Sequence, residues 1–77
     1  MIIGIPKESL PGENRVAILP TEINQLSSDD FVFKIESGAG TGSFISDKDY
    51  SAANAEISAD VYSDSDLIIR INPPYVD

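Results

Sequence analysis

The cationic side chains beside the ends of the first and last apolar runs are the residues whose types and spacing favour chemistry. Lys7 and Arg15 follow the apolar run at residues 2–5, and Arg70 lies near the end of the run at residues 67–71. If both runs are parallel strands, their carboxyl ends meet at one edge of a sheet, where open α/β sheets bind ligands. A guanidinium there can bind a carboxylate through two parallel hydrogen bonds. Lys7, Arg15 and Arg70 are therefore candidates to line a cleft for a small carboxylate.

The same three cations have a simpler interpretation as solvated or paired charges. Arg15 lies within reach of Glu13 and Glu8, and the spacing alone favours a salt bridge over a ligand site. Lys7 and Arg70 could equally be exposed charges without a ligand. Both interpretations stay open at this point.

The composition argues against several other kinds of site. The chain has neither cysteine nor histidine, which removes disulfides, thiolate metal sites and the commonest general base. Its acids lack the spacing of a calcium loop, so we expect no metal. The formal charge of −8 repels phosphate, so we expect neither nucleic acid nor direct membrane contact. We expect a cytoplasmic protein with no complete catalytic site in this chain.

A glycine-rich segment at residues 38–42 invites comparison with nucleotide-binding loops. The dinucleotide fingerprint G-x-G-x-x-G needs a third glycine where this chain has Ser43, and no Lys-Ser/Thr pair follows. Glycines also serve tight strand-to-helix turns. We therefore expect a turn here and no cofactor bound by this chain.

Alternating apolar runs and polar breaks predict the elements that must position these residues. Pro20 suits the first position of a helix, and Ser46 with Asp49 resembles a capping box that starts a second helix. In that second helix we expect Tyr50 to face inward, and Asn54 suits the left-handed backbone conformation at the end of the helix. Strands are expected at residues 1–5, 31–35, 56–57 and 67–71, the last of them buried, with a partly helical crossover at residues 60–66.

This order predicts an α/β fold with a small parallel sheet of about four strands and two to three helices, in two or three layers. It corresponds to half of a flavodoxin-like domain, with right-handed connections. Seventy-seven residues allow one domain with a small core. We therefore expect another copy of the chain, or a further domain, to cover its open faces and edges.

The sequence resembles the N-terminal end of the alanine dehydrogenase / nicotinamide nucleotide transhydrogenase α-subunit family along essentially its whole length. The resemblance favours the transhydrogenase α subunit, because the loop at residues 11–13 and the stretch at residues 43–47 are more similar to that branch. Blocks that match in register carry it, at residues 3–8, 11–17, 20, 36–40, 46–50, 52–57 and 66–73.

The resemblance implies that residues 1–77 are the first half of the family's N-terminal domain, with no NAD-binding Rossmann domain present. It implies that the full-length enzyme uses NAD(P), and that the catalytic histidine and aspartate lie beyond residue 77. Arg15 would hold the substrate carboxylate, as the corresponding arginine holds pyruvate in alanine dehydrogenases. The transhydrogenase would transfer hydride between NAD(H) and NADP(H), whereas this chain alone would be inactive.

Departures from the family keep other possibilities open. Arg70 stands where the family usually has a lysine, and Asn54 where it has a glycine. The links at residues 27–30 and 59–66 are short. The alternatives are therefore the N-terminal segment of an alanine dehydrogenase, or a free-standing, self-associating α/β module without catalysis. Whether residue 77 is a natural end is likewise open.

Overall fold

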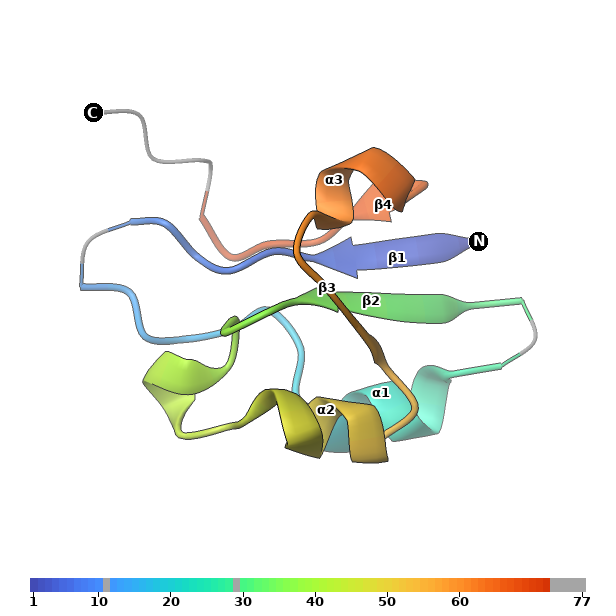
Figure 1. Cartoon of the computed structure of the whole chain (residues 1–77), viewed down its shortest axis with the longest axis horizontal. Coiled ribbons are helices and arrows are strands. Elements are labelled where there is room, and N and C mark those ends of the chain that lie inside the picture. The colour runs from blue at the N-terminus through green and yellow to red at the C-terminus, as the bar shows by residue number, and fades with distance from the viewer. Residues whose placement is uncertain (11, 29, 73–77) are drawn as a thin grey trace.

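Four short parallel strands form the sheet, in the order β3-β2-β1-β4. The structure is a computed structural model that describes residues 1–10, 12–28 and 30–72. Three helices and one 3-10 turn connect the strands (Figure 1). In chain order the elements are β1 (Ile2–Ile5), α1 (Pro20–Leu26), β2 (Val32–Glu36), η1 (Thr41–Ser43), α2 (Asp47–Ala52), β3 (Glu56–Ser58), α3 (Val61–Asp64) and β4 (Leu67–Ile68).

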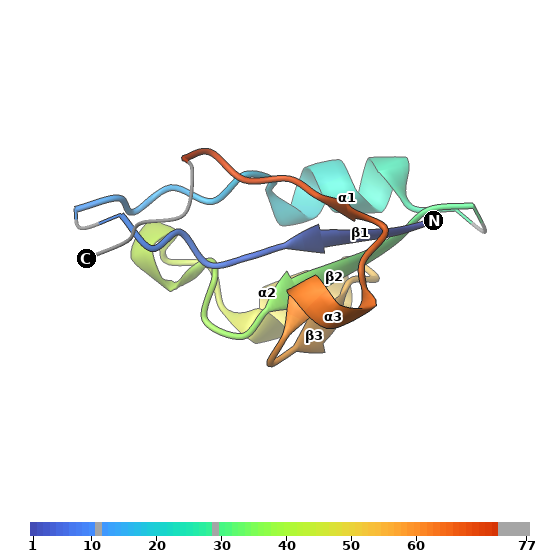
Figure 2. The same cartoon turned by 90° about the horizontal axis from the view of Figure 1, so that it is seen from above.

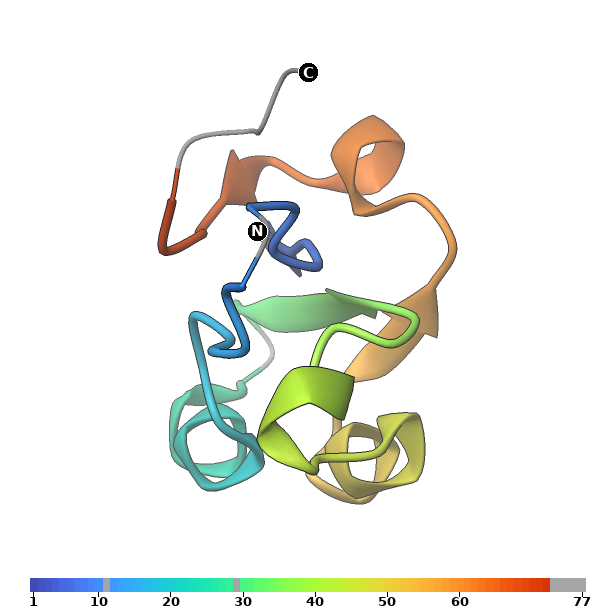
Figure 3. The ribbon, with the colours of Figure 1, turned by 90° about the vertical axis from the view of Figure 1, so that its left-hand side faces the viewer.

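The order of the strands explains how the helices are divided between the two faces. The chain moves outward from β1 to β2 and β3, then returns to place β4 on the other side of β1. Because parallel crossovers are right-handed, this reversal requires the last helix to lie on the opposite face. Accordingly, α1 and α2 pack side by side on one face, while α3 covers β1 and β2 from the other (Figures 2 and 3). The fold therefore has three layers, and the α/β prediction is confirmed.

The core lies between the sheet and the pair α1 and α2. Ile5 and Ile35, from neighbouring strands, are fully buried against Ile23 of α1. Tyr50 of α2 is also fully buried, and its hydroxyl donates to the Ile18 carbonyl at 2.7 Å. Burial, with a smaller contribution from the charge of Glu22, raises the pKa of Tyr50 to about 12.

Helix-end signals in the sequence are confirmed at the expected residues. Pro20 is the first residue of α1, where its missing N–H costs no hydrogen bond. At α2 the Asp49 N–H donates to the Ser46 hydroxyl at 3.2 Å, and the Ser46 N–H donates to the Asp49 carboxylate at 3.0 Å. Asn54 adopts the expected left-handed conformation, with φ of 75°.

The prediction of a buried last strand is wrong. Only Leu67 and Ile68 are strand residues, and Leu67 and Ile69 are 45% and 38% exposed. The run 67–71 is apolar enough for a central strand, but β4 lies at the edge of the sheet, with β1 as its one neighbour among the described strands. The sequence pattern indicates that the run is apolar, but not whether it lies at the centre or at the edge of the sheet. The sequence also predicts that Asn72, Pro73 and Pro74 end this strand, and residues 73–74 lie outside the described residues.

Candidate functional site

A cleft of about 220 Å³ opens beyond the carboxyl ends of β1 and β2. Two of the three cations predicted from the sequence line it, namely Lys7 and Arg15. Arg70 is not among the lining residues. The remaining lining comes from the loop after β1 and from the glycine-rich turn, through Glu8, Glu13, Asn14, Gly38, Ala39, Thr41 and Gly42.

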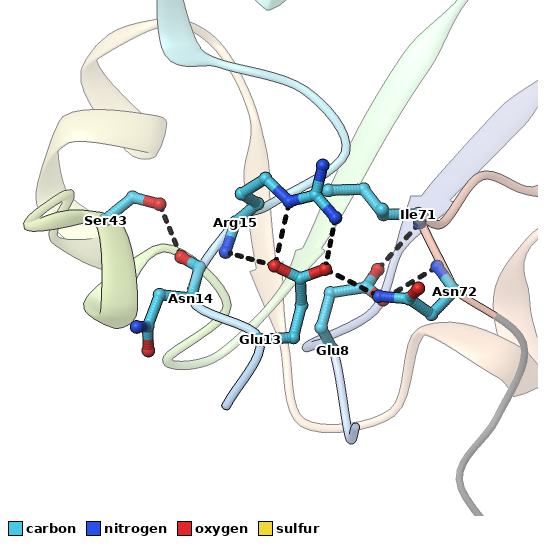
Figure 4. Close-up of polar contacts among 7 residues, drawn as sticks. All are labelled: Glu8, Glu13, Asn14, Arg15, Ser43, Ile71 and Asn72. Atoms are coloured by element: carbon cyan, nitrogen blue, oxygen red, sulfur yellow. Dashed lines mark hydrogen bonds and ion pairs between the residues drawn. The ribbon is translucent and has the colours of Figure 1, made fainter. Parts of the chain in front are cut away.

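Arg15 both lines this cleft and forms the salt bridge that the simpler interpretation predicted. Its Nε donates to one Glu13 carboxylate oxygen at 2.9 Å, and its Nη2 donates to the other at 2.6 Å (Figure 4). This bidentate pair uses the Nε/Nη2 edge of the guanidinium and leaves Nη1 without a hydrogen bond to the described residues, so that Nη1 can donate to a ligand. The Arg15 side chain is 69% exposed, so a carboxylate in solution can reach that edge.

Glu13 is held ionised by its hydrogen bonds. Its side chain is only 9% exposed, and it accepts from Arg15 and from the Asn72 amide, the latter at 2.7 Å. Hydrogen bonds from Arg15, and next from Asn72, lower the pKa of Glu13 to about 2. Glu13 therefore keeps its charge at neutral pH and serves as a fixed partner for Arg15.

Glu8 attaches the loop after β1 to the chain segment after β4. Although an acid, it is buried, and its carboxylate accepts the N–H groups of Ile71 at 2.9 Å and Asn72 at 3.0 Å (Figure 4). Strands β1 and β4 border the point where the strand order reverses, a place where open α/β sheets bind ligands, whereas the cleft itself lies on the side of β1 and β2. The sequence indicates Glu8 only as a possible ion-pair partner of Arg15 and does not indicate Asn72 as a member of the site, because these residues come together only in space.

Lys7 supplies a second positive charge to the cleft. Its backbone N–H donates to the Glu36 carboxylate at 3.2 Å, which places the residue at the end of β1. Its Nζ lies close to Gly38, 3.9 Å from where a Cβ on that glycine would be. Within the described part of the chain, no carboxylate lies within ion-pair distance of this ammonium. Lys7 can therefore add to the positive potential that Arg15 provides.

Arg70 makes a different set of contacts, on the side of α3. Its Nε donates to the Asn72 carbonyl at 2.6 Å, its Nη1 donates to the Tyr62 hydroxyl, and its Nη2 contacts the Ser9 hydroxyl at 3.4 Å. These contacts hold the segment after β4 against α3 and the loop after β1.

The glycine-rich turn does not fit the phosphates of a dinucleotide. The Gly38 N–H donates to the Asp47 carboxylate at 2.9 Å, and the Ala39 and Thr41 N–H groups donate to backbone carbonyls. A phosphate cradle needs such N–H groups free and directed at the ligand. The turn instead supports the Arg15 loop, because the Ser43 hydroxyl donates to the Asn14 carbonyl at 2.5 Å (Figure 4).

Two further features concern residues 1–10, 12–28 and 30–72 only. No cluster of acids there could hold a metal ion. No helix formed by these residues has the length and apolar character needed to cross a membrane.

The fold and this cleft define an α/β unit with a candidate ligand site beyond the carboxyl ends of β1 and β2. The sequence profile of the family described as alanine dehydrogenase/PNT, N-terminal domain, matches residues 4–77. The chain belongs to this family.

Individual relatives agree with this assignment. The chain is 43% identical to an alanine dehydrogenase of Methanococcus maripaludis and 41% identical to one of Bacillus subtilis, over 96% of its length in each case. These matches cover 21% and 20% of the two enzymes, so the chain spans about a fifth of the length of these relatives.

Two solved structures have the same fold. An L-alanine dehydrogenase superposes with a TM-score of 0.83 at 29% identity, and a transhydrogenase from Sinorhizobium meliloti with a TM-score of 0.80 at 37% identity. Each match covers 91% of this chain, and 20% and 21% of the respective structures. The resemblance to both branches of the family is thereby confirmed, and the two branches are not separated.

Proposed function

We propose that this chain forms the substrate-binding side of an alanine dehydrogenase-type oxidoreductase, which binds the carboxylate of a small 2-oxo or 2-amino acid such as pyruvate or alanine. The observation that carries the proposal is a cleft lined by Arg15, whose Nη1 makes no hydrogen bond with the described residues, and by Lys7, whose ammonium has no ion-pair partner among them. The names of the curated relatives support the same substrate class.

The residues of this chain would bind and orient the substrate. Arg15 would donate hydrogen bonds from Nη1 and Nη2 to the two carboxylate oxygens, while Lys7 neutralises remaining negative charge. A cleft of about 220 Å³ suits a ligand of a few heavy atoms. The nicotinamide cofactor would be held by residues outside this chain, because the glycine-rich turn uses its N–H groups internally.

A transhydrogenase α subunit is the second candidate, and it is the one that the loop sequence at residues 11–13 favours. The solved transhydrogenase is more similar in sequence to this chain than the solved alanine dehydrogenase, at 37% against 29% identity. In that case the cleft would face the bound nucleotide instead of a free carboxylate substrate. Further domains or subunits, or a second copy of the chain, would be the partners in either case.

Titration with pyruvate, followed through backbone amide shifts, tests the proposal. We expect shifts at Lys7, Arg15 and Gly38, and an affinity that falls roughly 10- to 100-fold in Arg15→Ala, because a charged hydrogen-bonding partner is lost. Lys48→Ala removes the same charge from the exposed surface of α2 and should bind like the wild type. Absence of pyruvate shifts, together with hydride transfer between NAD(H) and NADP(H) in the intact protein, would favour the transhydrogenase.

A further inference from the structure

We infer that Asn72 is a positioning residue, which acts through Glu13 to fix the orientation of the Arg15 guanidinium at the cleft. This inference rests on the proposed carboxylate site and adds to it the residues that orient the cation.

The exposed Arg15 side chain depends on Glu13 for its orientation. With 69% of its surface exposed, it has little packing to restrict its rotamers. Both side-chain hydrogen bonds that it makes with the described residues go to Glu13. The direction in which Nη1 and Nη2 face is therefore set by where the Glu13 carboxylate is held.

Asn72 holds the Glu13 oxygen that matters for this orientation. The Asn72 Nδ2 donates at 2.7 Å to Oε1 of Glu13, the same atom that accepts from Arg15 Nη2 at 2.6 Å. The shared oxygen couples the position of Nη2 to the position of the Asn72 amide. Apart from Arg15, whose backbone N–H it also accepts at 3.2 Å, the Glu13 carboxylate is held by Asn72, and without the Asn72 contact it could rotate and carry the guanidinium with it.

Asn72 is itself fixed from two directions. The Asn72 backbone N–H donates to the buried Glu8 carboxylate at 3.0 Å, and the Asn72 carbonyl accepts from Arg70 Nε at 2.6 Å. The chain of contacts thus runs from the end of β4 across to the loop after β1, as Figure 4 shows for Glu8, Asn72, Glu13 and Arg15. Arg70 therefore contributes to the site through Asn72 and not by lining the cleft.

Preorganisation gives this arrangement its functional value. A ligand that meets an ordered guanidinium does not have to restrict that side chain when it binds. Weakening the restraint on Arg15 should lower affinity for a carboxylate even though the charge of the cleft is unchanged. This separates a positioning role from a simple electrostatic one.

The test compares Asn72→Ala with Asn24→Ala, since neither substitution changes charge. The Asn24 side-chain oxygen accepts a hydrogen bond from the Asn54 amide at 3.3 Å, away from the cleft. Labelling with 15N-arginine gives two Nε–H signals, because Arg15 and Arg70 are the only arginines. We expect Asn72→Ala to move the Arg15 signal toward that of free arginine and to weaken pyruvate binding roughly 3- to 10-fold. Asn24→Ala should do neither.

An unchanged Arg15 Nε–H signal in a folded Asn72→Ala protein would overturn the inference. The signal is read without ligand, so it decides the inference even if wild-type protein binds no pyruvate, a result that would instead overturn the proposed function. If Asn72→Ala does not fold, Glu13→Asp provides the second test, since it keeps the charge but shortens the side chain. We expect it to shift the Arg15 signal, whereas Glu56→Asp, at the exposed ion pair with Lys34, should leave it unchanged.

Discussion

The Glu13 carboxylate makes the cleft sensitive to acid. Its pKa in the folded chain is about 2, below the ordinary value of 4.5, because Arg15 and Asn72 donate hydrogen bonds to its ionised form. A group with a lowered folded-state pKa contributes stability that is complete above its ordinary pKa and disappears as the pH falls through the folded value. The contribution of Glu13 should therefore fade between about pH 5 and about pH 2.

Urea unfolding of wild type and Glu13→Gln at several pH values checks this sign. We expect the difference in free energy of unfolding between the two proteins to be largest near neutral pH and to shrink on acidification. A difference that stays constant down to about pH 2 would show that Glu13 titrates normally in the folded chain. Asp47 and Asp60 also have lowered pKa values, but both proteins share them, so their effects cancel in the comparison.

At the scale of elements, the two longer helices begin in different ways. Helix α2 has a complete capping box from Ser46 and Asp49. Helix α1 begins after Leu19, which has no side-chain acceptor, and it relies on Pro20 and on the Glu22 carboxylate, which accepts the Leu19 N–H at 2.8 Å. Since α2 carries Tyr50 into the core, its start affects the stability of the whole chain.

Ser46→Ala should lower the free energy of unfolding by about 1 kcal/mol, because the Asp49 N–H loses its side-chain acceptor. Ser51→Ala is the matched control, since Ser51 is exposed within α2 and alanine is the better helix former. Chemical denaturation of both variants gives the comparison. Equal destabilisation by the two substitutions would contradict a specific capping role.

At the scale of the whole molecule, the sheet has a stable centre and a weak edge. Strands β1 and β2 pair over four residues and have helices on both faces, whereas β4 pairs over two residues and is partly exposed. Local opening requires less free energy where fewer hydrogen bonds and buried contacts are lost. The edge formed by β4 should therefore open before the centre does.

Amide hydrogen exchange measures this difference directly. We expect the slowest exchange within β1 and β2. Exchange should be clearly faster at Ile69, which directly follows β4 and whose N–H donates to the Gly4 carbonyl. Exchange at Ile69 as slow as that of the central strands would contradict this order. That result would mean that β4 opens only when the whole chain unfolds.

Much of the fold could be predicted because its signals are local. Proline at the start of α1, the capping box at Ser46 and the left-handed Asn54 each depend on neighbours a few residues away, and each is confirmed. The parallel α/β class follows from the alternation of such elements. The exposure of β4 could not be predicted, because an apolar run does not record whether another strand lies beside it.

The sequence by itself determined which residue types are present and where they stand relative to strand ends, and hence that Arg15 and Lys7 lie near one edge of the sheet. Only the tertiary structure decided that Arg15 both pairs with Glu13 and faces the cleft, and that Arg70 acts elsewhere. The deciding contacts join residues far apart in the chain, such as Glu13 and Asn72. Contacts of that kind form when the strand order reverses around β1, and no local pattern encodes them.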